Sequence, residues 1–261
     1  MRKYLEVAKD AALRAGRILK DNVTGTRDIS YKGEINMVTE MDRLSEKTIV
    51  ETILKTFPGH GILAEEGSSV ESNSGFLWVI DPLDGTTNYA HGYPSFAVSI
   101  GLERHGEIVL GIVYDPLRDE LFTAVKNAGS SLNGRQISVS RNDILIRSLL
   151  ATGFPYDRVV SRENNLNYFN ALIMESQEVR RSGAASLDLC NLAVGRLDGY
   201  WELKLHPWDV AAGSLIVQEA GGKVSDFSGS RFSIHDKEII ASNGKIHEQM
   251  LDVIRAVQRS S

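Results

Sequence analysis

A series of short apolar segments between residues 77 and 139 places the tightest constraint on how this chain can fold. Leu77–Ile80 is a compact apolar run that stops at Asp81-Pro82, which is typical of a buried strand running into a loop. Turn signals at His105-Gly106 and, most strongly, at Asn133-Gly134 divide the region that follows. The strand-like segments between the turns are Ser95–Leu102, Ile108–Tyr114, Leu121–Val125 and Ile137–Val139. The sequence therefore predicts a sheet of consecutive antiparallel hairpins.

Helical patterns flank this region on both sides. Apolar residues spaced three and four apart between Leu5 and Leu19 predict an amphipathic first helix. A second helix is expected to begin near Thr39, to carry Asp42 in its first turn, and to end at Pro58-Gly59. Further on, the sequence predicts helices at Leu187–Val194 and Asp209–Glu219, with a strand at Gly199–Leu203 between them.

These elements do not alternate as regular βαβ units, so the pattern indicates the α+β class, with helices and sheets in layers. The chain of 261 residues is short enough for one domain around a shared core. We expect a single domain over residues 1–261, or two lobes of it that divide near residue 145.

Charge and cysteine content narrow the classes of function. The chain has 29 Lys and Arg against 34 Asp and Glu, and this net charge of −5 argues against nucleic acid as the main partner. Cys190 is the only cysteine, which excludes an internal disulfide and a thiolate zinc cluster. Neither a signal peptide nor an apolar run of about eighteen residues is recognisable. We therefore expect a cytoplasmic protein that does not enter a membrane.

The segment Asp81–Asn88 is the most informative for chemistry. Asp81 and Asp84 stand three residues apart at the end of the predicted strand, and a carbonyl such as that of Leu83 lies between them. Carboxylates and carbonyls suit a hard cation such as Mg²⁺, and the amides of Gly85 and Thr86 at a helix start would suit a phosphate oxygen. The alternative is a turn-rich loop, in which Asp, Pro, Gly and Thr are all common.

Other acids have equally plain alternatives when each is taken alone. Glu65-Glu66 is typical of a solvated loop, Asp209 of a helix N-cap, and Asp42 of a first-turn acid. The histidines are scattered, so oxygen ligands favour Mg²⁺, or Mn²⁺, over zinc. The sequence has no phosphate-binding P-loop, no dinucleotide fingerprint and no Gly-x-Ser-x-Gly elbow.

Taken together, the motifs resemble those of the inositol monophosphatase family. Asp81–Asn88 is similar to the first signature of the family, and Trp208–Gly213 is similar to the second. Val38–Asp42, Glu65-Glu66 and Glu219–Gly222 follow in family order and spacing. The resemblance extends from the first helix to beyond residue 240.

The resemblance implies a role for each matching position. The implied metal ligands are Glu65, Asp81, Asp84 and Asp209 with the Leu83 carbonyl. Thr86 and Asp42 would orient the attacking water, and Glu65 would act as its base. The residues implied to contact substrate are Leu83, Asp84, Gly85, Thr86, Gly183, Ala184, Ala185, Glu202 and Asp209. The family fold is a layered αβαβα sandwich with largely antiparallel sheets, and members are commonly lithium-sensitive homodimers.

The expected activity is Mg²⁺-dependent hydrolysis of a phosphomonoester of a polyol or sugar, with inositol 1-phosphate first, by attack of metal-activated water. Arg180-Arg181 leaves an alternative open, because an arginine there could contact the second phosphate of fructose 1,6-bisphosphate, although the pair is as consistent with a solvated edge. A second alternative is a non-enzymatic regulator that binds a phosphorylated ligand. Ala184, where many members carry a hydroxyl, and a slightly short loop at Lys32–Ile35 depart from the family pattern.

Overall fold

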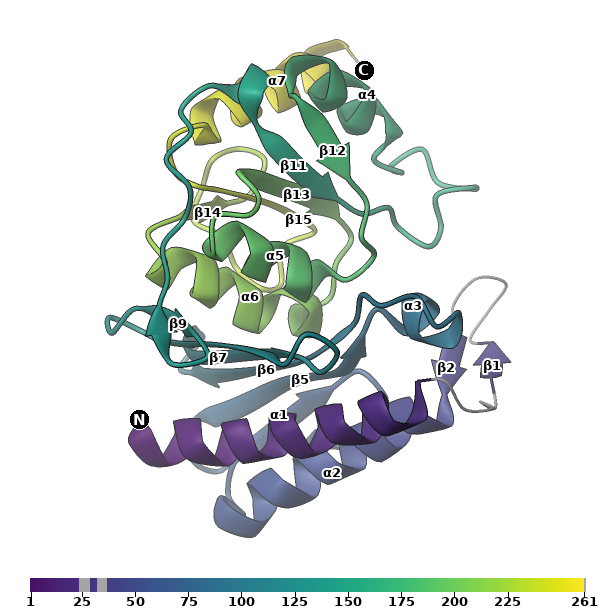
Figure 1. Ribbon diagram of the computed structural model, residues 1–261, viewed down its shortest axis with the longest axis vertical. Coiled ribbons are helices and arrows are strands. Elements are labelled where there is room, and N and C mark those ends of the chain that lie inside the picture. The colour runs from purple at the N-terminus through teal and green to yellow at the C-terminus, as the bar shows by residue number, and fades with distance from the viewer. Residues whose placement is uncertain (24–28, 32–36, 261) are drawn as a thin grey trace.

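The protein is a stack of alternating helical and sheet layers in the order αβαβα (Figure 1). The structure is a computed structural model that describes residues 1–23, 29–31 and 37–260. The first layer holds α1 (Arg2–Asn22) and α2 (Glu40–Thr56), and both pack on the first sheet. Between the sheets lie α5 (Ala185–Ala193) and α6 (Pro207–Glu219), and the last layer holds α4 (Leu166–Glu175) and α7 (His247–Ser260). The predicted α+β sandwich is confirmed.

The first sheet has eight described strands in the order β10-β9-β8-β7-β6-β5-β3-β4. Its strands are β3 (Gly61–Ala64), β4 (Ser69–Val70), β5 (Phe76–Asp84), β6 (Ala97–Arg104), β7 (Glu107–Asp115), β8 (Glu120–Val125), β9 (Ser130–Leu132) and β10 (Arg135–Gln136). Only the β3–β5 pair of this described sheet is parallel, so the predicted chain of antiparallel hairpins is confirmed for β5 to β8.

The strand predicted at Ile137–Val139 is wrong. The Asn133-Gly134 turn closes a shorter hairpin, β9–β10, and the chain leaves the sheet after Gln136. Ile137 N donates to Ser130 O at 3.1 Å, whereas Val139 N donates to Ala220 O at 3.2 Å, at the end of α6. Both side chains pack against the central core, which explains why they are apolar. The alternating apolar pattern here results from that packing and not from a strand in the sheet.

The second sheet has the described order β12-β11-β13-β15-β14 and mixes parallel with antiparallel pairs. Its strands are β11 (Leu149–Thr152), β12 (Glu178–Arg180), β13 (Gly199–Leu203), β14 (Lys223–Ser225) and β15 (Glu238–Ser242). The strand predicted at Gly199–Leu203 is therefore confirmed, and it lies in the middle of this sheet. A small hairpin, β1 (Ile29–Tyr31) with β2 (Met37–Thr39), precedes α2, and the loop at 32–35 lies outside the described residues.

Small residues set how closely α6 lies on the first sheet. A Cβ on Gly101 would lie 2.9 Å from Ala211 Cβ, and one on Gly111 would lie 2.7 Å from Ala212 O. Because no side chain fits at either strand position, the helix backbone rests directly on β6 and β7. This close packing fixes the first turn of α6 beside the end of β5, where the candidate site lies.

Among the described residues, no helix is both long and apolar enough to cross a membrane.

Candidate active site

The site begins where β5 bulges. The sequence predicted that this strand ends at Asp81-Pro82, but β5 continues to Asp84. Asp81 pairs with Ser99 and Asp84 with Ala97, so β5 carries one residue more than β6 in this interval. A proline cannot donate a ladder hydrogen bond, and the bulge at Pro82 accommodates that loss without ending the strand. Asp81 and Asp84 are both buried there.

Directly after the bulge, Gly85 turns the chain into the short helix α3 (Thr86–Ala90). Gly85 has φ +93°, and a Cβ at this position would lie 2.8 Å from the Ser95 carbonyl oxygen. Only glycine therefore fits. The turn places Thr86 Oγ1 3.1 Å from Leu83 O and 3.4 Å from Asp42 Oδ2, so the hydroxyl donates toward both. Asp42 is buried in the first turn of α2, as the sequence predicted.

Carboxylates from separate elements gather at this point. Burial raises the pKa of Asp81 well above its ordinary value, and the charges of Glu65, Asp84, Asp209 and Asp42 raise it further. Burial likewise raises the pKa of Asp209, with further contributions from Asp84 and Glu65. Acids affect each other in this way only when they share one poorly solvated region. The structure thus brings together the acids that the sequence pattern singled out separately.

Different hydrogen bonds position each of these acids. Glu65 follows β3, and its backbone N–H donates to Ile80 O at 3.2 Å, which anchors it beside β5. Asp209 accepts a hydrogen bond from His206 N at 2.7 Å as the third residue of a capping box. The N-cap of α6 is His206, so the N-cap position predicted for Asp209 is wrong, because α6 begins two residues earlier, at Pro207. Asp84 Oδ2 accepts from Ser186 N at 2.7 Å and from Ser186 Oγ at 2.5 Å. Burial raises the pKa of Asp84 to about 6, and the bonds from Ser186 oppose that rise.

A pocket opens above the acids, and the second sheet supplies its far wall. Its lining residues are Asp84, Gly85, Thr152, Gly153, Phe154, Tyr156, Arg181, Gly183, Ala184, Ala185, Asp188, Glu202, Leu205 and Asp209. This set includes the segment Gly183–Ala185 and Glu202, which the resemblance placed at the substrate.

The far wall is fastened to α3. Asn88 Nδ2 donates to Ser95 O at 2.7 Å and to Ser182 O at 2.8 Å, which joins the two halves of the site. Gly183, the residue after Ser182, has a left-handed backbone conformation with φ +84°. On β13, Glu202 Oε2 accepts from Tyr200 OH at 2.5 Å. Burial raises the pKa of Glu202 to about 7, against the opposing effects of Tyr200 and Arg181.

The adjacent residues Arg180 and Arg181 lie in different surroundings. Arg180 is exposed and lies 3.6 Å from Glu178 as a surface ion pair, as the solvated reading predicted. Arg181 lines the pocket and its outer extension, which is also lined by Gly85, Thr87, Phe154, Tyr156, Arg158 and Gly183. The floor of the site is therefore acidic, while its mouth carries two arginines.

Several residues of the site were not predicted from the sequence. Tyr156 lies in the loop after β11 and is 53% exposed. Partial burial and the nearby acids Glu65, Asp209 and Asp84 raise its pKa. No local motif marks that loop. Ser186 and Asp188 did leave a signal, because they are polar residues at buried positions of the apolar helix α5.

The donor set fits a hard divalent cation. Its members are buried or partly buried carboxylates, and burial and neighbouring acids raise the pKa values of Asp81 and Asp209, so a nearby cation would relieve both burial and repulsion. All of the donors are oxygens, and Cys190, the only thiol in the sequence, is buried in α5. In the described residues, no three His, Cys, Asp or Glu side chains form a group that could hold a metal ion as they stand.

Comparisons with known proteins agree over nearly the whole chain. A family model described as the inositol monophosphatase family matches residues 1–259. A relative named inositol-1-monophosphatase, from Synechocystis sp., is 46% identical and covers 98% of this chain and 90% of its own length. A relative named Nus factor SuhB, from Pseudomonas aeruginosa, is 44% identical over 98% of this chain and 97% of its own. The solved structure of inositol monophosphatase from Anabaena (Nostoc) sp. superposes with a TM-score of 0.90 at 42% identity, covering 98% of this chain and 96% of that one.

Proposed function

This chain belongs to the inositol monophosphatase family and is a phosphatase, and from that premise we propose that it hydrolyses phosphate monoesters of small cyclic polyols, inositol 1-phosphate first. The observation that carries the proposal is the buried carboxylate cluster beneath a pocket whose far wall carries Glu202. A bare cluster of acids would repel a phosphate dianion by about 4 kcal/mol for each like-charge pair at ~4 Å, so the acids make chemical sense only with a cation.

The metal ligands in this proposal are Glu65, Asp81, Asp84 and Asp209 with the Leu83 carbonyl, and the metal is Mg²⁺, which Mn²⁺ could replace. When bound, such a cation neutralises the acids, polarises the phosphate and makes water more acidic. The bulge of β5 and the capping box of α6 fix the directions from which Asp81 and Asp209 approach.

The chain itself would handle the proton of the attacking water. Thr86 Oγ1 donates toward Leu83 O and Asp42 Oδ2, so its lone pairs are left to accept from a water, which this contact would orient. Glu65 would take the proton from that water as it attacks phosphorus. The P–O bond to the polyol then breaks, and the polyol oxygen takes the proton that Glu65 had accepted, so that the polyol leaves as an alcohol. Phosphate and alcohol are the products, and no covalent enzyme intermediate is needed.

Phosphate release from inositol 1-phosphate with and without Mg²⁺ tests the proposal. We expect Asp84→Asn to fold and to lower kcat by at least ~10²-fold, because the cation contributes several kcal/mol. Asp252→Asn makes the same chemical change at an exposed position in α7 and serves as the matched control. Near-normal turnover by Asp84→Asn at saturating Mg²⁺ would remove the proposal.

A second substrate class has a specific observation in its favour. The outer extension of the pocket is lined by Arg158 and Arg181 and by no acid among the described residues. Two guanidinium groups there could contact a second phosphate, as in fructose 1,6-bisphosphate. Comparable rates on inositol 1-phosphate and fructose 1,6-bisphosphate would indicate an enzyme with both activities.

A regulatory role is the alternative from another class, and relatives named Nus factor SuhB are its motivation. Release of phosphate distinguishes the two, because a non-enzymatic regulator would release none from inositol 1-phosphate, fructose 1,6-bisphosphate, histidinol phosphate or phosphoadenosine phosphate. A single domain over residues 1–261, a homodimer, a cytoplasmic location, lithium inhibition and the absence of nucleic acid as main partner remain predictions of the sequence and its resemblance.

A further inference from the structure

Asp188 is a buried acid in the pocket that the proposed hydrolysis leaves without a role. It lies in the first turn of α5, is 3% exposed, and lines the same pocket as Glu202. Burial raises the pKa of Asp188, and the charge of Glu202, which lines the same pocket, raises it further. An acid is rarely buried without a partner or a ligand.

Both carboxyl groups are held at one oxygen. Ser182 Oγ donates to Asp188 Oδ1, and Tyr200 OH donates to Glu202 Oε2. Neither Asp188 Oδ2 nor Glu202 Oε1 has a hydrogen bond within the described residues. Each group therefore offers a second acceptor oxygen beside the pocket.

The surroundings allow these groups little movement. A Cβ on Gly153 would clash with the Glu202 carboxylate, so that carboxylate packs directly against the β11 end. Ser182, which holds Asp188, is itself held through its carbonyl oxygen by Asn88 Nδ2 at 2.8 Å. Burial raises the pKa of both carboxyl groups, and the nearby positive charge of Arg181 opposes that rise.

We propose that Asp188 is a specificity-determining residue, which together with Glu202 accepts hydrogen bonds from neighbouring hydroxyl groups of the substrate alcohol. This inference rests on the proposed phosphatase reaction and specifies the alcohol that it releases. A cyclic polyol presents several hydroxyl donors close together, and a pair of preorganised acceptors matches that arrangement. A leaving group without hydroxyls would leave both acceptors desolvated and unpaired, which is costly.

The test compares two substrates, inositol 1-phosphate and phenyl phosphate, at saturating Mg²⁺. Asp188→Asn can keep an oxygen acceptor toward Ser182 but replaces the second acceptor by an amide donor. We expect the ratio of kcat/KM for inositol 1-phosphate to that for phenyl phosphate to fall about tenfold, since one lost hydrogen bond to a buried charged group is worth ~1.5–3 kcal/mol. Asp252→Asn, exposed and far from the pocket in α7, is the matched control and should keep the wild-type ratio.

An equal loss on both substrates would overturn the inference, because it would assign Asp188 only to the support of the Ser182 turn. An unchanged ratio would overturn it as well. If circular dichroism shows that Asp188→Asn does not fold, Asp188→Ser keeps a polar group near Ser182 and must lower the same ratio. Failure of the wild-type protein to hydrolyse either ester would refute the proposed function itself and is therefore distinguishable.

Discussion

At the scale of single residues, the structural and the chemical roles of the acids coincide. Asp209 completes the capping box of α6 and also belongs to the carboxylate cluster. Asp42 lies in the first turn of α2 and also receives the Thr86 hydroxyl. The first-turn interpretation of Asp42 was therefore correct, whereas Asp209 caps its helix from the third position and not as the N-cap, and neither structural role competes with the functional one. The N-terminus of a helix suits such a group, because the helix dipole stabilises a carboxylate there.

Thr86→Ala should lower kcat much more than it changes KM. The substitution removes the hydroxyl between Leu83 O and Asp42 Oδ2 that would orient the attacking water, and such groups contribute ~10²–10⁴-fold to the rate. Steady-state kinetics with inositol 1-phosphate measures the effect, and Thr86→Ser, which keeps the hydroxyl, is expected to restore most of kcat. A change confined to KM would instead assign Thr86 to uniform substrate binding.

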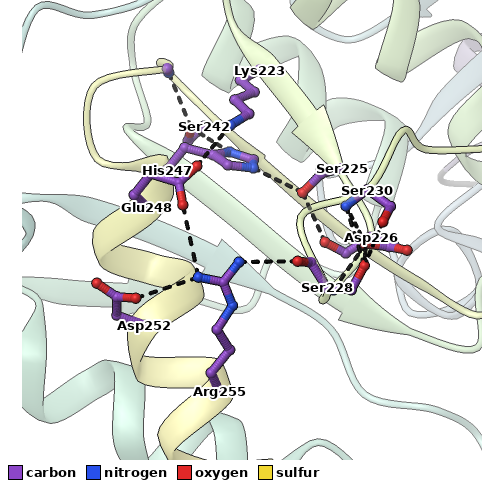
Figure 2. Close-up of polar contacts among 11 residues, drawn as sticks. Lys223, Ser225, Asp226, Ser228, Ser230, Ser242, His247, Glu248, Asp252 and Arg255 are labelled. Atoms are coloured by element: carbon purple, nitrogen blue, oxygen red, sulfur yellow. Dashed lines mark hydrogen bonds and ion pairs between the residues drawn. The ribbon is translucent and has the colours of Figure 1, made fainter.

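At the scale of elements, buried side-chain hydrogen bonds tie the ends of strands and helices together. The start of α7 is an example away from the active site (Figure 2). His247 is fully buried there, with Nδ1 2.9 Å from Ser242 Oγ of β15 and Nε2 2.9 Å from Ser225 Oγ of β14. Burial lowers the pKa of His247 to about 4, so the folded protein keeps this ring neutral.

His247 should make stability depend on pH. Its folded pKa lies below the ordinary value of 6.5, so its contribution is complete above pH 6.5 and is lost as the pH falls toward 4. Urea unfolding should show that the stability advantage of wild type over His247→Gln shrinks by about 2–3 kcal/mol between pH 7 and pH 4. The exposed His235, changed to Gln, is the control and should give no such trend. A constant difference across this range would contradict the buried neutral ring.

At the scale of the whole molecule, the site is shared between the layers. Asp81 and Asp84 come from the first sheet, Asp209 and Asp188 from the central helices, and Glu202 from the second sheet. Packing these layers together buries like charges against one another, which opposes folding until a cation is present. The stability of the fold and the chemistry of the site are therefore coupled.

Metal-free protein should be stabilised by the loss of one of these acids. The pKa of Asp84 is raised to about 6 in the folded state, so its charge destabilises the fold increasingly as the pH rises from about 4 to 6, and fully above that. At pH 8 in a chelator, Asp84→Asn should raise the free energy of unfolding by up to ~3 kcal/mol. Mg²⁺ should then stabilise wild type more than Asp84→Asn, as measured by urea unfolding with Asp252→Asn as control. A less stable metal-free Asp84→Asn protein would contradict this coupling.

The sequence by itself determined which segments form helices and which form strands, most of the first sheet, and which acids are candidates for the site. Local periodicity and turn chemistry located α1, α2 and β6 to β8 to within a few residues, because those signals depend only on neighbours along the chain. Periodicity failed at Ile137–Val139, where apolar side chains pack without a strand, and at Pro82, where the strand continues through a bulge.

Only the tertiary structure decided which residues share the pocket. Tyr156, Arg181 and Asp188 line it from segments far along the chain from Asp84. Ser186 does not line the pocket but holds Asp84 by hydrogen bonds from α5. Arg180 does not line it either, although it adjoins Arg181. No local sequence pattern predicts that these residues lie close together, since their proximity depends on how the two sheets stack and on the hydrogen bonds of Asn88. Sequence spacing determines what each side chain is and which element carries it, but burial and charge in the assembled layers determine what it can do.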